Sequence, residues 1–408
     1  MRKSPYWLLF IGFMLLLDIY FFLALQVVAA PADAGTRVII YAVYWVLSVA
    51  AIVIFWALPF MQFKHHARQA RSTIFSILAG LFFAKFIGSL VFAAGDISRL
   101  IQWAGGESVD RSFAFSWSGI IAGVSLFGIL VYGFGNKYKY QIKRIKLNYD
   151  NLPAAFAGLK IVHISDIHSG SFSNKEAVIK GVDKIMKEEP DLILFTGDMV
   201  NNVADEMKDY MDVFDKLKAP LGVYSTLGNH DYGDYVQWKN AEEKEANLER
   251  LKQVHHSLGW RLLMNEHIVL EKTQLVEEQK RESIAIIGIE NWSAKARFPK
   301  YGNLKKAYDG ADLHPFKILL SHDPSHWKEE VLKDYPGIDL MLAGHTHGMQ
   351  FGLELPGFKW SPVQYVYREW AGLYEMANQK LYVNRGFGFI GYPGRSGILP
   401  EITVLELN

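Results

Sequence analysis

Five short patches of polar residues carry most of the side chains in this 408-residue chain that are suited to catalysis. They are Asp166-Ile167-His168, Gly197-Asp198, Gly228-Asn229-His230-Asp231, Ser321-His322-Asp323 and Gly344-His345-Thr346-His347. The patches offer carboxylates, imidazoles and a carboxamide but no thiolate, because the chain has no cysteine. Such donors suit hard or borderline divalent metals such as manganese, iron or zinc. They outnumber the ligands of one ion and suit two ions that share a bridging carboxylate, so we predict a dinuclear metal site.

Each patch follows a short run of strand-forming residues. The runs are rich in Ile, Leu, Val and Thr and span residues 160–165, 191–196, 223–227, 317–320 and 339–343. Side chains that repeatedly sit just past the end of a strand point toward one rim of a sheet, where they can meet. We therefore expect the five patches to converge, although they are scattered along the chain.

The order of the patches resembles the signature of a known family. D-x-H, G-D, G-N-H-D, a lone H and G-H-x-H, in this order, are typical of the calcineurin-like metallophosphoesterases. Further short matches at residues 384–386, 393–395 and 400–402 resemble the membrane-attached branch of YkuE/YaeI type. The resemblance implies an α/β (α+β) sandwich of two β-sheets flanked by helices over residues 159–408. Helical stretches at residues 175–189, 204–217 and 241–258, which alternate with the strands, agree with that fold.

The resemblance also implies a role for each ligand. The first metal would be held by Asp166, His168 and His347, the second by Asn229, His322 and His345, and Asp198 would bridge both. Two divalent ions about 3.5–4 Å apart can clamp the attacking and the leaving oxygen of an in-line displacement. A hydroxide held between them would be the nucleophile at neutral pH.

Four further residues receive catalytic or substrate-binding roles. The resemblance implies that His230 donates a proton to the leaving oxygen and that Asp231 orients His230. Arg385 and Arg395 are candidates for bidentate contacts to a phosphate or diphosphate, although the glycines around them equally fit a loop-shaping role. The aromatic run at residues 351–374 follows the last ligand and is expected to border the metal site, either as core packing or as an apolar wall for acyl chains.

The first third of the chain has the character of a membrane domain. Four apolar stretches at residues 6–30, 38–60, 73–95 and 113–135 are each long enough to span about 30 Å of hydrocarbon. They predict a four-helix transmembrane domain over residues 1–136. A basic juxtamembrane linker at residues 137–158 follows, in which Tyr138 and Tyr140 beside lysines read as an interfacial anchor or as a simple stop signal.

Two charges interrupt the apolar stretches. Asp18 and Lys85 each lie twelve residues past the start of a stretch, and these two helices run in the same direction, so both charges sit about 18 Å deep. Because an isolated charge at mid-bilayer is costly, a buried ion pair is one expectation. The alternative is a snorkelling Lys85 with a neutral Asp18 in the bundle interior.

Orientation follows from the Lys and Arg residues of the short loops. One side carries Arg2, Lys3, Lys64, Arg68, Arg71, Lys137, Lys139, Lys143, Arg144 and Lys146, and the other carries Arg37, Arg99 and Arg111. This bias predicts an integral protein of a bacterial inner or cell membrane whose catalytic domain faces the cytoplasm. A cleaved signal peptide ending near Ala30 is an alternative that leaves the orientation unchanged.

These features predict a membrane-anchored, metal-dependent phosphoric ester or pyrophosphate hydrolase with two divalent ions (Mn, Fe or Zn). A lipid-linked substrate such as UDP-diacylglucosamine is the favoured specific expectation, and we expect no nucleic-acid partner. The alternatives are a phosphodiesterase acting on nucleotides or other soluble phosphoesters, and a membrane sensor or scaffold with an attached metal-binding domain.

Overall fold

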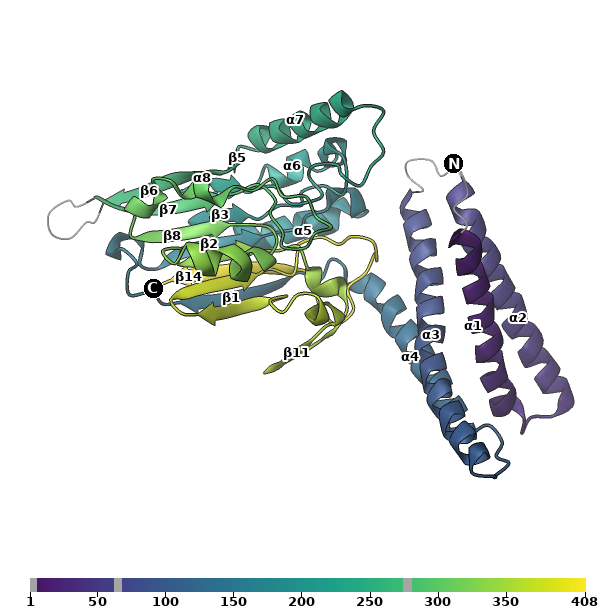
Figure 1. Cartoon of the computed structure of the whole chain (residues 1–408). Helices are drawn as coiled ribbons and strands as arrows, with labels where there is room; N and C mark the ends of the chain where they lie inside the picture. Colours follow the sequence, from purple (N-terminus) through teal and green to yellow (C-terminus); the bar gives the residue numbers. More distant parts are fainter. Residues whose placement is uncertain (1–5, 62–67, 274–280) are drawn as a thin grey trace. The chain divides into compact units, whose positions relative to one another are not determined.

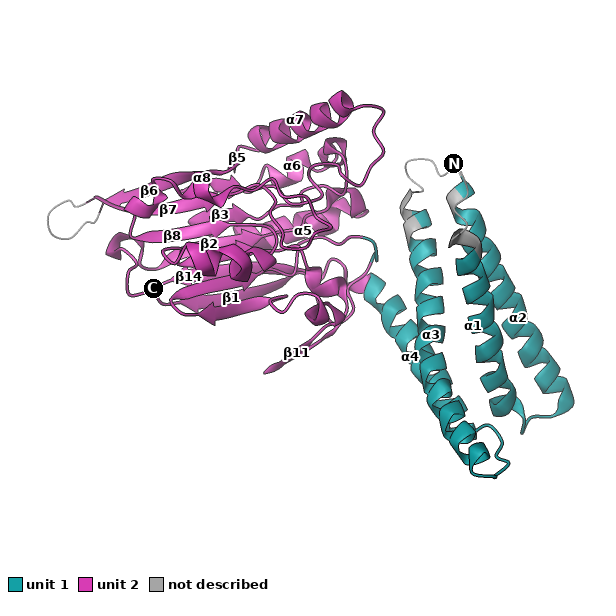
Figure 2. Cartoon of the chain, viewed as in Figure 1, with its two compact units in different colours: residues 1–134, 391–393 teal, residues 135–390, 394–408 magenta. Residues whose placement is uncertain are grey.

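The computed structural model of the chain describes residues 6–61, 68–273 and 281–408. It divides into two compact units, residues 1–134 with 391–393 and residues 135–390 with 394–408 (Figure 2). Arg2, Lys3 and Lys64, on which the expected membrane orientation partly depends, lie outside the described residues.

The first unit consists of long apolar helices (Figure 1). They are α1 (Tyr6–Ala29), α2 (Ala34–Ala57), α3 (Arg68–Ala104) and α4 (Phe113–Gly133). All four are long and apolar enough to cross a membrane, as predicted. The N-termini of α2 and α4 are capped by Asp33 and Ser112, whose side chains accept hydrogen bonds from backbone N–H groups three residues on.

Helix α3 is longer than the stretch expected at residues 73–95 and continues past Asp96. The Asp96 carboxylate accepts hydrogen bonds from the Tyr20 hydroxyl at 2.9 Å and from Arg111 Nε at 3.0 Å. Because these hydrogen bonds compensate the charge of Asp96, the helix continues past it. From the sequence alone, Asp96 marks the end of the apolar stretch, so the expected helix ends there.

Glycines allow α3 and α4 to approach closely. A Cβ atom added to Gly119 would lie 2.6 Å from the carbonyl oxygen of Gly88 and 2.2 Å from the Phe92 ring. Neither distance is compatible with a side chain, so the crossing requires glycine at this position, as is common between membrane helices.

The expected ion pair between Asp18 and Lys85 is present, and both residues are buried. Ser48 of α2 completes it, with its hydroxyl 2.8 Å from Asp18 Oδ1 and 2.9 Å from Lys85 Nζ. The Tyr44 hydroxyl donates a further hydrogen bond to Asp18 Oδ1 at 3.0 Å. The snorkelling alternative for Lys85 is therefore wrong, and the polar cluster ties α1, α2 and α3 together.

The second unit contains two six-stranded sheets, as the predicted sandwich requires (Figure 1). The first has the order β1 (Gln141–Leu147), β14 (Glu401–Leu407), β2 (Leu159–Ile164), β3 (Leu192–Phe195), β4 (Val223–Ser225), β5 (Arg261–Leu262). The second has the order β12 (Gly372–Met376), β13 (Gln379–Val383), β9 (Leu340–Ala343), β8 (Phe316–Leu320), β7 (Arg281–Gly288), β6 (Glu266–Thr273). Strands β2, β3 and β4 are mutually parallel, and so are β7, β8, β9 and β13.

Alternating side chains divide the core into layers. In β3, Leu192 and Leu194 join the cluster that contains residues of both sheets, while Ile193 and Phe195 face the helical side. That helical side consists of α5 (Lys175–Met186), α6 (Met211–Phe214) and α7 (Ala241–Ser257). Helices α8 (Leu304–Tyr308) and α9 (Leu332–Asp334) cover the second sheet.

Two local expectations differ from the structure. The helix expected at residues 204–217 is divided into η6 (Ala204–Met207) and α6, because Tyr210 has a non-helical backbone (φ −122°, ψ 0°). Residues 141–147 of the expected linker form the edge strand β1 of the first sheet.

The expected anchor is also tied into the second unit. Tyr140 is buried and stacks on Phe387 at 4.3 Å between ring centroids. Lys143, Arg144 and Lys146 pair with glutamates of the same unit. Tyr140 is therefore part of the core and no headgroup anchor, whereas an anchoring role of the other residues of this segment stays a prediction.

We expect the Lys85→Met variant to lower the free energy of unfolding in detergent by about 3 kcal/mol, because it leaves the Asp18 carboxylate buried without its cation. The double variant Asp18→Asn/Lys85→Met should lose less, since no charge remains buried. Chemical unfolding of both variants beside the wild type measures the difference. Equal stability of the single and double variants would contradict the pairing.

Candidate metal centre

The predicted ligands all follow the carboxyl ends of parallel strands. The connections are Asp166 and His168 after β2, Asp198 after β3, Asn229 after β4, His322 after β8, and His345 and His347 after β9. The two sheets are joined at this end, where His322 Nδ1 lies 2.7 Å from the Thr196 carbonyl oxygen. Strand ends of both sheets therefore deliver their ligands to one place.

Asp166, His168 and His347 form the first cluster. Each offers one ligand-type atom, and these atoms lie within 4.8 Å of one another. His347 Nε2 is 3.2 Å and His168 Nε2 is 3.9 Å from Asp166 Oδ1. All three residues are buried, so their polar atoms are removed from water.

Asp198, His322 and His345 form the second cluster under the same 4.8 Å limit. His322 Nε2 lies 3.2 Å from Asp198 Oδ2 and 3.2 Å from His345 Nδ1. Asn229 joins them, with its Oδ1 atom 2.8 Å from His345 Nδ1. Asp198 Oδ2 is also 3.5 Å from His168 Nε2 of the first cluster. The Asp198 carboxylate thus lies between the clusters, where a bridging ligand belongs.

The residues fit a pair of divalent cations. Within the described part of the chain, both ring nitrogens of His168 and Nε2 of His347 are buried without a hydrogen-bond partner. Leaving such an atom unsatisfied costs about 1–3 kcal/mol. A cation bound by these nitrogens and the neighbouring carboxylates would remove that cost, and imidazole with carboxylate is a donor set that transition metals accept.

The backbone is strained at the ligands. Of the ten described non-glycine residues with positive φ, five are expected ligands: Asp166, His168, Asp198, His345 and His347. This region is rarely occupied by residues that carry a Cβ atom. Such strain persists only where the surrounding structure enforces it, and it collects at functional sites.

Electrostatics favour the ligating form of most of these side chains. Burial alone would raise the pKa of Asp166, but the neighbouring His347 lowers it well below its usual value. Burial holds the pKa of His168, His345 and His347 below that of a free imidazole. The exception is His322: Asp198 raises its pKa to about 10 although burial opposes the rise, so metal binding would release its proton.

His230 and Asp231 do not contact each other as expected. His230 Nδ1 lies 2.7 Å from the Asn201 carbonyl oxygen, and the His230 ring packs edge-on against His168. The buried Asp231 carboxylate instead accepts hydrogen bonds from the backbone N–H groups of Asp198 and Gly228 at 2.8 and 2.9 Å. The interpretation of Asp231 as the residue that orients His230 is wrong, because its oxygens are used to hold two ligand-bearing loops together.

Arg385 and Arg395 are not free to contact a substrate. Arg385 is 4% exposed and pairs with Glu401 and Glu354. Arg395 is fully buried and donates to backbone carbonyls, among them that of Arg385 at 2.7 Å and that of His347 at 3.2 Å. The prediction of substrate arginines is therefore wrong, and the loop-shaping alternative describes Arg395.

Sequence reasoning missed the groups that orient His345. The Tyr367 hydroxyl lies 2.9 Å from His345 Nε2 and donates a hydrogen bond to Asp323 Oδ2 at 3.0 Å. With its Nε2 atom facing Tyr367, His345 presents Nδ1 to Asn229 and His322. Asp323 is adjacent to a ligand and Tyr367 belongs to the aromatic run, but nothing in the sequence indicates that the two meet.

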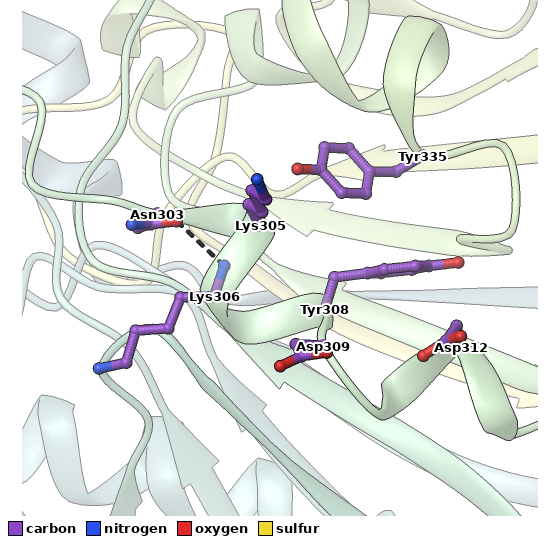
Figure 3. Close-up of a pocket in the computed structure, with 7 residues that line it drawn as sticks. All are labelled: Asn303, Lys305, Lys306, Tyr308, Asp309, Asp312 and Tyr335. Atoms are coloured by element: carbon purple, nitrogen blue, oxygen red, sulfur yellow. Dashed lines mark hydrogen bonds between the residues drawn. The ribbon is translucent and has the colours of Figure 1, made fainter.

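A separate hollow of about 530 Å³ lies on the second sheet's helical side (Figure 3). It is lined by Asn303, Lys305, Lys306, Tyr308, Asp309, Asp312 and Tyr335. These walls mix both signs of charge and include none of the expected ligands. This hollow is therefore separate from the two clusters of expected ligands.

We expect Tyr367→Phe to weaken metal binding at the His345 cluster by about tenfold, because the imidazole loses the hydroxyl that fixes its orientation. Calorimetric titration of metal-free protein with Mn²⁺ measures the affinity, and the melting temperature of the metal-free protein reports on folding. Tyr365→Phe is the matched control, since that ring is 77% exposed. Unchanged affinity in Tyr367→Phe would contradict the orienting role.

Comparisons with known proteins agree with this geometry. Residues 159–349 match the family model "Calcineurin-like phosphoesterase", and residues 1–136 match "Probable Calcineurin-like phosphoesterase, transmembrane domain". The metallophosphoesterase YkuE of Bacillus subtilis is 33% identical over 63% of this chain and 82% of its own length. The UDP-2,3-diacylglucosamine pyrophosphatase LpxG of Chlamydia trachomatis is 32% identical over 64% of this chain and 88% of its own length.

A vertebrate relative is similar as well. The transmembrane protein with metallophosphoesterase domain of Danio rerio is 29% identical over 69% of this chain, and the match spans 60% of the fish protein. The transmembrane-domain model matches the part of the chain that forms the first compact unit, and the calcineurin-like model matches a part of the second unit. The chain therefore belongs to the calcineurin-like phosphoesterases, a family of metal-dependent hydrolases, and joins to that catalytic domain a domain of membrane-spanning helices.

Proposed function

We propose that the protein hydrolyses a phosphoester or pyrophosphate bond of a lipid-linked substrate, such as UDP-diacylglucosamine, at the cytoplasmic face of a bacterial cell membrane. The observation that carries the proposal is the position of the Asp198 carboxylate, within 3.5 Å of imidazoles of both ligand clusters. Two divalent ions bound there would neutralise the phosphoryl charge and activate the attacking water.

The protein's own residues would hold the metals and manage one proton. In this proposal Asp166, His168 and His347 bind one ion, Asn229, His322 and His345 bind the other, and Asp198 bridges them. The hydrogen bond from His230 Nδ1 to the Asn201 carbonyl would leave Nε2 turned toward the reaction. From there a protonated His230 would donate to the leaving oxygen.

An inverted hairpin supports a lipid-linked substrate. Strands β10 (Leu353–Leu355) and β11 (Phe358–Trp360) begin six residues after His347. Their apolar side chains face solvent: Leu353, Leu355 and Phe358 are 46%, 54% and 53% exposed. A hairpin normally buries its apolar face, so this arrangement calls for an apolar partner.

The charged side chains of the same hairpin point inward. Glu354 pairs with Arg385 and with Lys143, at 2.9 and 3.0 Å. Lys359 donates to the Ala371 carbonyl oxygen and lies over the Tyr374 ring at 4.4 Å. Because these pairs fix which face turns outward, the exposed apolar side chains are a property of the fold, and the acyl chains of a lipid-linked substrate would cover them.

The membrane orientation remains a proposal from charge bias. Lys and Arg residues are concentrated in the loops on one side of the four apolar stretches. That bias supports a cytoplasmic catalytic domain, where nucleotide-linked lipid precursors are accessible.

The test uses detergent-purified protein with manganese and two substrates, bis-p-nitrophenyl phosphate and UDP-diacylglucosamine. We expect turnover of the lipid to exceed that of the generic diester, and Asp198→Asn to lower both by at least about a hundredfold, because the bridging carboxylate is lost. Metal content of the variant by mass spectrometry reports on the ligand role. Turnover of the diester alone would retain the enzyme class and reject the lipid. Failure with both substrates, with metals bound, would reject this function and favour a binding role.

The hairpin makes a second prediction. Leu355→Ser/Phe358→Ser should lower kcat/KM for UDP-diacylglucosamine by about tenfold more than for bis-p-nitrophenyl phosphate, since two apolar contacts to acyl chains are lost. Assays in mixed micelles give both values. Leu313→Ser is the control, because it changes an 81% exposed leucine that is outside the hairpin. An equal effect on the two substrates would contradict a lipid-facing role.

A further inference from the structure

A loop that joins β7 to α8 borders the second ligand cluster. We call residues 291–302 the rim loop. Its shape is fixed internally, since Asn291 Nδ2 donates to the Pro299 carbonyl at 2.9 Å and Tyr301 N donates to the Asn291 carbonyl at 2.8 Å. A bond from Ala294 N to the Ser325 hydroxyl at 3.0 Å ties it to the segment that follows His322. The loop is therefore a defined wall of the site.

The rim loop reaches His345 through two aromatic rings. The Phe298 ring packs edge-on against the His345 imidazole at 4.8 Å between centroids. Lys295 Nζ lies 5.4 Å from the centre of the Tyr367 ring, whose hydroxyl contacts His345 Nε2. Arg297 lies over Phe298 at 4.8 Å. A single aromatic side chain thus separates each cation from His345: Tyr367 in the case of Lys295, and Phe298 in the case of Arg297.

These cations have no carboxylate partner. Within the described ranges, no Asp or Glu oxygen lies within 4.0 Å of the charged atoms of Lys295, Arg297 or Lys300, and the last two side chains are exposed. By contrast, Lys328 of the same unit pairs with Glu369. The positive charge of the rim loop therefore lies beside the side chains that contact His345.

From this geometry we propose that the rim loop is an anion subsite that holds the non-scissile phosphate of a diphosphate substrate, through Lys295 and Arg297. The inference rests on the proposed function and names the substrate class more narrowly. Divalent ions held by the two clusters would neutralise the phosphoryl group that reacts, so cations outside the clusters are available for a second anionic group. Arginine offers a planar fork that matches phosphate.

The test is direct binding to the full-length, manganese-loaded protein in detergent, with two probes. UDP-N-acetylglucosamine is a soluble diphosphate diester, and inorganic phosphate is a single phosphate. Calorimetry at low temperature gives both dissociation constants for wild type, for Lys295→Gln/Arg297→Gln and for Lys305→Gln/Lys306→Gln. The last variant removes two exposed charges from α8 and is the matched control.

We expect the rim-loop variant to weaken binding of UDP-N-acetylglucosamine about tenfold more than binding of phosphate, while the α8 variant shows no such preference. Equal weakening of both probes, the same preference in the α8 variant, or no binding of the diphosphate to wild type would overturn the subsite. Because the readout is binding, it is separate from the turnover assay. Absence of hydrolysis would count against the proposed function alone.

Discussion

The catalytic unit is organised around one buried carboxylate. Asp198 is 2% exposed, and its oxygens lie near the imidazoles of His168 and His322 and accept a hydrogen bond from the His230 backbone at 2.8 Å. A buried carboxylate is strongly destabilising without such compensation. The loops that provide the compensation must come very close: a Cβ atom on Gly228 would lie 2.2 Å from Asp198 Oδ1. Glycine at position 228 is therefore required for the close approach to the Asp198 carboxylate as well as for the turn itself.

Compensation of buried charge also explains which residues are structural. Asp18 and Lys85 in the membrane unit, and Arg385 with Glu401 in the catalytic unit, are buried pairs in which each charge already faces an opposite one. The rim loop has the opposite property, because its cations are near the ligands and have no carboxylate partners in the described structure. In the proposed subsite, the phosphate of a bound ligand would supply the opposite charge.

The ligand positions could be predicted from sequence because they depend on local order. Each follows a strand, and parallel strands bring their carboxyl ends to one edge, so spacing along the chain translates into proximity. The depth of Asp18 and Lys85 could be predicted for a similar reason, since helical rise converts residue number into distance. In both cases the regular geometry of a strand or helix converts positions in the sequence into positions in space.

Contacts between distant segments could not be predicted in this way. Arg395 looks like a phosphate ligand in a glycine-rich turn, and only the tertiary fold buries it against the loop of His347. Tyr367 and Asp323 are 44 residues apart, and their contact depends on how the aromatic run returns to His345. The break near Tyr210 likewise follows from the backbone of the folded domain, because the residues on both sides favour a helix.

The two unusual surfaces of the catalytic unit complement each other. The inverted hairpin follows His347 and offers exposed apolar side chains, whereas the rim loop contacts His345 and offers cations. The hairpin begins six residues after His347, and the rim loop contacts His345, which belongs to the same turn after β9. A small soluble phosphoester would use neither surface fully. Under the proposed function, a molecule with a charged diphosphate at one end and acyl chains at the other would use both surfaces, whereas a soluble nucleotide would leave the apolar hairpin uncovered.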